Sequence, residues 1–370
     1  MKKRKILQFP LTNSGSGVSR YILQNWKYID KQKFQFDFAT MNKELNMEPE
    51  LKKEGCEVFH ISCYAEDNPS EFSKEVTSIF AHGYDAVHLH TSYWKSLLIE
   101  EIARKLGIPK IIIHAHNSSI LEREDREEKE KRHWKCVKEL NENIATDFWA
   151  CSRKAADWLY GDSIPKDKIV IMKNAINTKE FKFSEEERRY LRKQLGLQED
   201  FVIGHVGRLT YQKNQEFLLK TFTKISKKYP FSKLLIVGNG PDKDKLQSLV
   251  KKGGIEKKVI MMEYREDINR IMNAMDLFVL PSLFEGFPIV LVEAQASGLK
   301  CLVSDRVSPE AAITDGIEFL ALEEDRWVRE IEKVILQGTT LNRDQMALAV
   351  SSAGYDIEKQ IKEIEFLYMR

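Results

Sequence analysis

Two glutamates stand eight residues apart in the segment FEGFPIVLVEAQASG, a spacing that suits sugar recognition. Glu285 follows the apolar run LFVLPS, and Pro288 suits the first turn of a helix on which Glu293 would lie. An ionised carboxylate accepts hydrogen bonds from two neighbouring hydroxyl groups, and the first N–H groups of that helix could bind an anion. The spacing fits equally well a Glu285 that caps the helix and a Glu293 that faces solvent.

Two cations lie in an upstream motif, GHVGRLTYQKN. Arg208 stands at the end of a predicted strand, and Lys213 comes five residues later, just before a predicted helix. A planar guanidinium and a lysine point charge beside a helix N-terminus could together neutralise a diphosphate. Taken alone, the motif also fits an ordinary solvated lysine.

The loop after the first predicted strand is rich in glycine and serine. Gly15 and Gly17 would let the backbone approach a phosphate closely, and Ser16 could donate a hydrogen bond at the head of a helix. A dinucleotide fingerprint needs a small residue where Arg20 stands, and it needs an acid after the next strand, FQFDFAT, which ends in threonine. The loop therefore argues against NAD, while a tight turn without a ligand stays open.

Four of the eight histidines lie at the ends of predicted strands. His88 and His90 alternate in AVHLH, and His114 and His116 alternate in IIIHAHNSS, so the members of each pair face one side of their strand. Such pairs could ligate a metal, but no aspartate or glutamate completes either pair. We therefore expect no metal site, a buried His88, and a His116 that lies beyond its strand, where substrate could reach it.

The composition is that of an ordered globular protein with two domains. A length of 370 residues exceeds what one hydrophobic core usually serves, and 42% of the residues are hydrophobic. Lys and Arg number 58 against 56 Asp and Glu, and the two signs are interleaved along the chain. This balance gives no electrostatic case for a nucleic-acid partner.

The sequence predicts a cytoplasmic protein. The basic start reaches Pro10 after only a few apolar residues, and no apolar run is long enough to cross a bilayer. The five cysteines are odd in number and lack a C-x-x-C pair, which is typical of reduced thiols. Membrane contact would be peripheral, through Trp134 and the lysines near it in the charged run 121–135; a solvent-facing helix is the other interpretation of that run.

Strand patterns alternate with helical patterns in both halves of the chain, which is the rhythm of parallel α/β sheets. The expected strands are 5–9, 34–40, 56–62, 86–90, 111–115 and 147–152, then 201–209, 233–238, 259–264, 277–282 and 301–305. We predict one domain at 1–178 and another at 179–354, with an amphipathic helix at about 355–370 that packs back on the first. Ligands would bind beyond the carboxyl ends of the strands, in a cleft between the sheets.

The motifs in order resemble those of the family 4 retaining glycosyltransferases, which have the GT-B fold of two Rossmann-like domains facing a central cleft. They are SGSGVSR, HAHNSS, ACS, KNAINTKEF, GHVGRLTYQKN, IVGNGPDKDKL and PSLFEGFPIVLVEAQASGLKCLVSD. The resemblance covers nearly the whole chain and is greatest to bacterial exopolysaccharide and capsular polysaccharide transferases. The chain departs from the commonest family pattern where SGSG replaces a plain Gly-Gly pair.

The resemblance implies a role for each motif. In the second domain it places Arg208 and Lys213 on the donor diphosphate, Glu285 beside the donor sugar, Gly286, Phe287, Pro288 and Ile289 on sugar hydroxyls and phosphate, Glu293 on the ribose, and Tyr264 and Arg265 beside the nucleobase. In the first domain, Gly15, Ser16 and Gly17 would close over the diphosphate. His116 matches the family's active-site histidine, with His114 as the alternative, and His116, Glu285, Arg208 and Lys213 would serve catalysis.

The implied reaction transfers a sugar, with retention, from a nucleoside diphosphate sugar to a hydroxyl group. The family favours UDP as the nucleotide and a glycan or polyprenyl-linked acceptor at the inner membrane face, in exopolysaccharide or capsule biosynthesis. No metal or other cofactor is implied. A sugar-nucleotide epimerase, a phosphorylase and a non-catalytic nucleotide-sugar-binding protein on the same scaffold are the alternatives.

Overall fold

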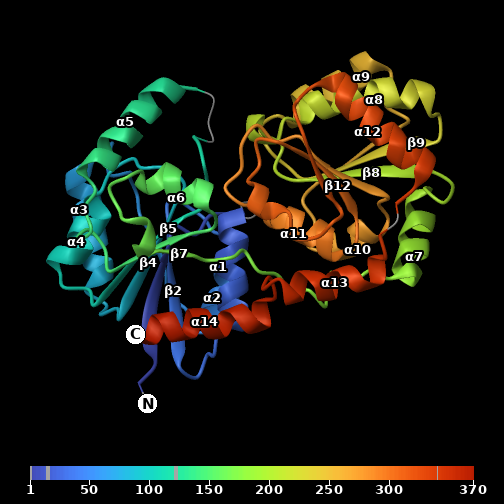
Figure 1. Cartoon of the computed structure of the whole chain (residues 1–370). Coiled ribbons are helices and arrows are strands. Elements are labelled where there is room, and N and C mark those ends of the chain that lie inside the picture. The colour runs from blue at the N-terminus through green and yellow to red at the C-terminus, as the bar shows by residue number, and fades with distance from the viewer. Residues whose placement is uncertain (1, 14–16, 121–123, 340) are drawn as a thin grey trace. The chain divides into compact units, whose positions relative to one another are not determined.

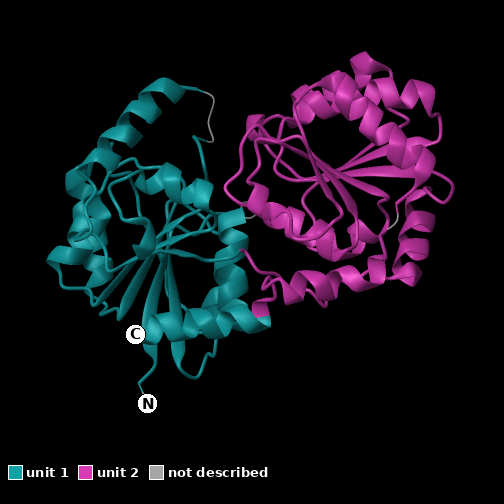
Figure 2. Ribbon diagram, in the orientation of Figure 1, with its two compact units in different colours: residues 1–173, 358–370 teal, residues 174–357 magenta. Residues whose placement is uncertain are grey.

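The computed structural model describes residues 2–13, 17–120, 124–339 and 341–370. The chain divides into two compact units, shown in teal and magenta in Figure 2. Unit 1 comprises residues 1–173 and 358–370, and unit 2 comprises residues 174–357. The first division falls five residues before the expected boundary at 178.

Unit 1 is built on a seven-stranded sheet with strand order β3-β2-β1-β4-β5-β6-β7, and each of its strand pairs is parallel. Its strands are β1 (Arg4–Phe9), β2 (Phe34–Thr40), β3 (Val58–His60), β4 (Ala86–Thr91), β5 (Lys110–Ala115), β6 (Asp147–Ala150) and β7 (Ile169–Ile171). Its helices are α1 (Gly17–Tyr28), α2 (Glu48–Lys53), α3 (Pro69–Phe80), α4 (Leu98–Lys105), α5 (Arg126–Glu139), α6 (Arg153–Tyr160) and all but the first residue of α14 (Ile357–Met369). Figure 1 shows these helices flanking the sheet.

Unit 2 has a six-stranded parallel sheet with strand order β10-β9-β8-β11-β12-β13. Its strands are β8 (Phe201–Val206), β9 (Ser232–Val237), β10 (Val259–Met262), β11 (Leu277–Leu280), β12 (Lys300–Ser304) and β13 (Ile317–Leu320). Its helices are α7 (Glu185–Leu195), α8 (Gln215–Lys228), α9 (Lys243–Gly253), α10 (Ile268–Asn273), α11 (Ile289–Ala296), α12 (Glu324–Gln337) and α13 (Arg343–Ser352). Phe222, Leu234 and Trp327 lie in its hydrophobic core.

Both sheets have a topological switch point, where strand order reverses and ligands of α/β proteins usually bind. In unit 1 the switch lies between β1 and β4, and in unit 2 it lies between β8 and β11. The loops that leave these four strands carry most of the residues singled out in the sequence. The sequence pattern correctly predicted the strands on which the site is built. It did not predict β7 and β13, which are short edge strands with partly exposed residues.

Unit 2 begins before the expected boundary at 178 because Ile176 and Thr178 contact its last residues. The backbone of Ile176 exchanges hydrogen bonds with Tyr355 and Ile357, and the hydroxyl of Thr178 contacts the carboxylate of Asp356. These contacts make the segment part of unit 2 rather than of unit 1.

The terminal helix α14 packs on unit 1, as its amphipathic pattern predicts. The ring of Tyr368 lies edge-on to Phe36, 5.9 Å between centroids, and its side chain is 1% exposed. Lys110 and Arg4 donate to the carbonyls of Leu367 and Met369 at 2.8 and 3.0 Å. The last turn of the chain is thereby tied to β1 and β5.

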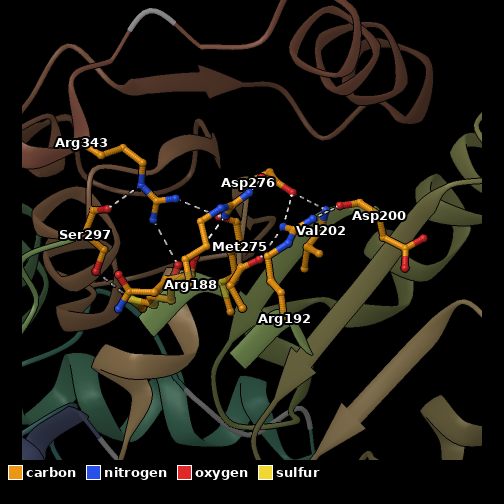
Figure 3. Close-up of polar contacts among 11 residues, drawn as sticks. Arg188, Arg192, Asp200, Val202, Met275, Asp276, Ser297 and Arg343 are labelled. Carbon is orange, nitrogen blue, oxygen red and sulfur yellow. Dashed lines mark hydrogen bonds and ion pairs between the residues drawn. The ribbon is translucent and has the colours of Figure 1, made fainter. Parts of the chain in front are cut away.

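Three arginines anchor α7 and α13 to the amino-terminal end of β11 (Figure 3). Arg188 and Arg192 of α7 bind the carboxylate of Asp276, which also accepts the backbone N–H of Val202 at 2.7 Å. Arg343 of α13 donates to the carbonyls of Ser297 and Met275 at 3.0 and 3.1 Å. Asp276 thus fixes β8 beside β11 at the end of the sheet opposite the loops that carry Lys213 and Glu285.

Candidate active site

An ion pair joins the two loops at the switch point of unit 2. The amine of Lys213, after β8, donates to Oε1 of Glu285, after β11, at 2.5 Å, and their side chains are 13% and 7% exposed. Ser282 donates to the same oxygen at 2.7 Å, and Gln212 donates to the carbonyl of Phe284 at 3.0 Å. Glu285 is therefore a buried carboxylate that accepts hydrogen bonds from a lysine and a serine. Lys213 is not an ordinary solvated lysine, and Glu285 does more than cap a helix.

A short turn after β8 brings Lys213 to this position. Residues Tyr211–Lys213 form a single 3-10 turn, and Asn214 then adopts a left-handed conformation, φ 54°, from which α8 begins. A Cβ atom on Gly207 would lie 3.3 Å from the Cε atom of Lys213, so the glycine gives the lysine stem room. The side chain of Arg208, on the same loop, is exposed.

The loop after β9 supports the Arg208 loop, a function that the sequence did not reveal. Gly207 and Leu209 donate backbone hydrogen bonds to Val237 and Asn239 at 3.0 and 2.9 Å. A Cβ atom on Gly240 would lie 2.2 Å from the carbonyl oxygen of Leu209, closer than any side chain allows. The glycines of IVGNGPDKDKL were the available signal.

Glu293 lies on α11, with 1% of its surface exposed. A solvent-facing Glu293 is thus ruled out, because every residue of this helix is buried. The helix begins at Ile289, and Pro288 occupies its N-cap position without a side-chain cap, one residue earlier than a first-turn proline. The initial N–H groups of a helix have no partner within the helix, so they are suited to an anion or to hydroxyl groups.

The segment before α11 is buried and held by its neighbours. Gly286 and Phe287 are both buried, and the ring of Phe287 stacks on Tyr355 at 5.5 Å with an interplanar angle of 13°. The carbonyl of Phe287 accepts a hydrogen bond from Asn174 at 2.9 Å. This packing fixes the backbone that leads from Glu285 into the helix.

Tyr264 and Arg265 follow β10, so they lie beyond the carboxyl ends of the strands, as the ion pair does. Tyr264 is 42% exposed, and Arg265 forms two hydrogen bonds of 2.7 Å with the carboxylate of Asp267. The Arg265 guanidinium lowers the pKa of Asp267. Exposure leaves the Tyr264 ring accessible, as a position beside the nucleobase would require, but that role stays a prediction.

In unit 1, the structure describes only part of the predicted glycine loop. Gly15 and Ser16 lie outside the described residues, so their expected role stays a prediction. Gly17 is the first residue of α1 and is exposed. Ser19 of α1 accepts a hydrogen bond from the backbone N–H of Thr12 at 3.1 Å, which ties the helix to the chain leaving β1.

His116 follows β5 and is partly buried. Its backbone N–H donates to Thr91 at the end of β4, and its Nε2 lies 2.8 Å from Nδ1 of His90. Burial lowers the pKa of His116 to about 3, so the ring is neutral at physiological pH. His114 is fully buried in β5, which leaves His116 as the more accessible of the two candidates.

Ring nitrogens of His88, His90 and His114 lie within 4.8 Å of one another, close enough to hold a metal ion. The rings of His88 and His90 are stacked, 4.2 Å between centroids, and both nitrogens of each ring contact a protein partner. Burial lowers the pKa of all three histidines well below the ordinary value. The contacts describe a network of neutral rings, in which Gln8 and Tyr368 take part although the sequence did not indicate them.

These two units, each with a switch-point site, define a two-domain α/β enzyme of the GT-B type. A model of glycosyl transferase 4-like domains matches residues 16–175, and a model of group 1 glycosyl transferases matches residues 187–347. The chain belongs to the family 4 glycosyltransferases of GT-B fold.

Relatives of similar length support this assignment. A putative glycosyltransferase of Bacillus subtilis, EpsF, is 27% identical over 99% of this chain and 96% of its own. The UDP-Gal:alpha-D-GlcNAc-diphosphoundecaprenol alpha-1,3-galactosyltransferase of Escherichia coli is 26% identical over 99% and 97%. The fold is similar to that of Anabaena HepE in complex with UDP and glucose, with a TM-score of 0.79, 19% identity and 99% of each chain covered. Among the described residues, no helix is both long enough and apolar enough to span a membrane.

Proposed function

We propose that this enzyme transfers a sugar, with retention, from a UDP-sugar to a hydroxyl group of a glycan or polyprenyl-linked acceptor in exopolysaccharide or capsule biosynthesis. The observation that carries the proposal is the Lys213–Glu285 contact at the switch point of unit 2, with exposed Arg208 on the same loop. The two cations suit a diphosphate, and the carboxylate suits a sugar hydroxyl group.

In this proposal the cations stabilise the departing nucleoside diphosphate. A lysine amine has three N–H donors, so Lys213 can keep Glu285 as a partner and still bind a phosphate oxygen. Arg208 adds a planar fork, and the first amides of α11 add a fixed dipole. Preorganised donors of this kind stabilise developing negative charge without a metal ion.

Glu293 would bind the ribose hydroxyls, Tyr264 and Arg265 would border the base, and the backbone 286–289 would meet the sugar. His116 of unit 1 would contact the donor sugar, and Gly15 to Gly17 the diphosphate. A UDP donor and a lipid-linked acceptor are supported by the activity for which the E. coli relative is named and by the UDP and glucose bound to HepE.

A cytoplasmic location with a peripheral membrane contact would suit a lipid-linked acceptor. Helix α5 exposes Trp134, 42%, among Lys131, Lys135 and Lys138. An aromatic ring flanked by lysines favours an anionic lipid surface. Sedimentation with anionic vesicles, compared between the parent and Trp134→Ser, tests this part; equal binding of the two proteins would refute it.

Calorimetric titration with UDP, GDP, several UDP-sugars and NAD tests the donor site without an acceptor. The informative variant is Glu293→Gln, because a smaller residue at this buried position would also leave a cavity. We expect UDP compounds to bind the parent, with or without EDTA, and to bind the variant at least tenfold more weakly, about 1.4 kcal/mol. Binding of NAD alone, or equal UDP affinity in both proteins, would contradict the proposal.

A further inference from the structure

A chain of hydrogen bonds runs through the interior of unit 1 and ends at His116. Its members come from β1, β4, α14, the end of β5 and the residue just after it. In order they are His116, His90, Gln8, Tyr368, His88 and His114, with successive distances of 2.8, 2.8, 3.0, 2.6 and 3.2 Å. Gln8 and Tyr368 together join the pair His116–His90 to the pair His88–His114.

Neutral rings make the chain directional. Burial disfavours the imidazolium, and the pKa of each of these four histidines lies far below its ordinary value. A neutral imidazole has one N–H donor and one acceptor nitrogen. Where two rings are in direct contact, as in His90–His116, the tautomer of one ring therefore determines the tautomer of the other.

The structure places the carboxamide of Gln8 between the hydroxyl of Tyr368 and the ring of His90. Its nitrogen donates to the hydroxyl of Tyr368 at 3.0 Å, and its oxygen lies 2.8 Å from Nε2 of His90. An amide oxygen only accepts, so Nε2 of His90 carries the hydrogen and Nδ1 of His90 is an acceptor. The nitrogen of His116 that faces this acceptor, Nε2, must then be the donor.

We propose that Gln8 is a positioning residue that holds His116 in its Nε2–H tautomer, so that the ring offers Nδ1 as an acceptor for a hydroxyl group of the ligand. The inference rests on the proposed function, in which His116 contacts the donor sugar. An acceptor nitrogen takes a hydrogen bond from a sugar hydroxyl, whereas the opposite tautomer would present an N–H group there.

The side chain at position 8 can be changed so as to keep or remove this control. Glutamate retains an acceptor oxygen for His90 whether its carboxyl group is ionised or protonated. Methionine has nearly the same shape but neither an amide oxygen nor an N–H group. Gln8→Glu should therefore preserve the tautomer of His116, and Gln8→Met should release it.

The direct test is nitrogen NMR of the full-length protein with ring-labelled histidine, with the His116 signals assigned by their absence in His116→Asn. In the parent we expect Nε2 of His116 to be protonated and Nδ1 to be unprotonated. Protonated Nδ1 in the parent would overturn the proposal even if no variant folded. The same tautomer in the parent and in folded Gln8→Met would overturn it too.

Steady-state kinetics supply a second readout. We expect Gln8→Met to lower kcat/KM for the UDP-sugar about tenfold, with UDP affinity unchanged, and Gln8→Glu to restore most of the loss. Unchanged kinetics in Gln8→Met would refute the role of Gln8 in the reaction. A parent that binds no nucleotide sugar would refute the proposed function instead, and the NMR result would still decide whether Gln8 sets the tautomer.

Discussion

The amine of Lys213 and the carboxylate of Glu285, in the loops that follow the neighbouring strands β8 and β11, meet at 2.5 Å although the two residues are 72 positions apart in the sequence. Ser282 and Gln212 surround the same carboxylate. Both ionic side chains are mostly buried, so removing either partner leaves a charge with reduced solvation.

Lys213→Gln should lower the free energy of unfolding by roughly 3 kcal/mol, because it leaves the Glu285 carboxylate buried without its cation. UDP affinity should fall at least tenfold as well. Urea denaturation and calorimetry measure the two effects. Lys220→Gln, which removes an exposed lysine of α8, is the control and should change neither quantity; a Lys213→Gln protein as stable as that control would show that the ion pair contributes nothing.

Gly240→Ala should damage the Arg208 loop. The added methyl group would lie 2.2 Å from the Leu209 carbonyl, so the backbone 207–209 must move. We expect weaker UDP binding and a loss of about 2 kcal/mol of stability, by thermal unfolding and calorimetry. The stability control is Gly17→Ala, where no described atom lies within 4 Å of the added carbon; equal thermal stability of the two variants would contradict the close approach.

Tyr368→Phe should loosen α14. The hydroxyl group accepts from Gln8 and contacts His88, and its loss leaves polar atoms of both residues buried with one partner fewer. A cost of about 1–3 kcal/mol is expected in urea denaturation. Phe366→Leu, on the exposed face of the same helix, should cost little, and a Tyr368→Phe variant no less stable than Phe366→Leu would exclude the network as an anchor of the helix.

Two buried groups should give stability opposite dependences on pH. Burial lowers the pKa of His205 to about 4, so between the ordinary value of 6.5 and pH 4 the unfolded chain binds a proton that the folded chain does not, and stability falls as pH falls. Burial raises the pKa of Glu100 to about 8, so between pH 8 and its ordinary 4.5 the folded chain holds the extra proton, and stability rises as pH falls.

Urea denaturation at pH 8, 6.5 and 5 of the parent, His205→Gln and Glu100→Gln separates the two contributions. Relative to the parent, His205→Gln should lose less stability from pH 6.5 to 5. Glu100→Gln should lack the gain in stability that the parent shows when the pH falls from 8 to 6.5. Parallel profiles for all three proteins would mean that neither group titrates as its burial requires.

The sequence alone determined the two-sheet architecture and the loops that carry the site. Repeating strand and helix periods are local properties, and parallel topology puts the carboxyl ends of β8, β10 and β11 at one edge of their sheet. Arg208, Lys213, Glu285 and Glu293 could therefore be placed from their order and spacing.

Only the tertiary structure decided which of these side chains meet. The Lys213–Glu285 pair, the support of Leu209 by Gly240 and the chain from Gln8 to Tyr368 all join residues far apart in sequence, and no local period encodes such contacts. The same is true of Glu293, whose burial depends on what packs around α11, and of residues 174–178, whose unit is set by pairing with residues 355–357. Burial and long-range contacts arise only when the whole chain packs. The spacing of the two glutamates therefore could not decide whether Glu293 is buried or faces solvent.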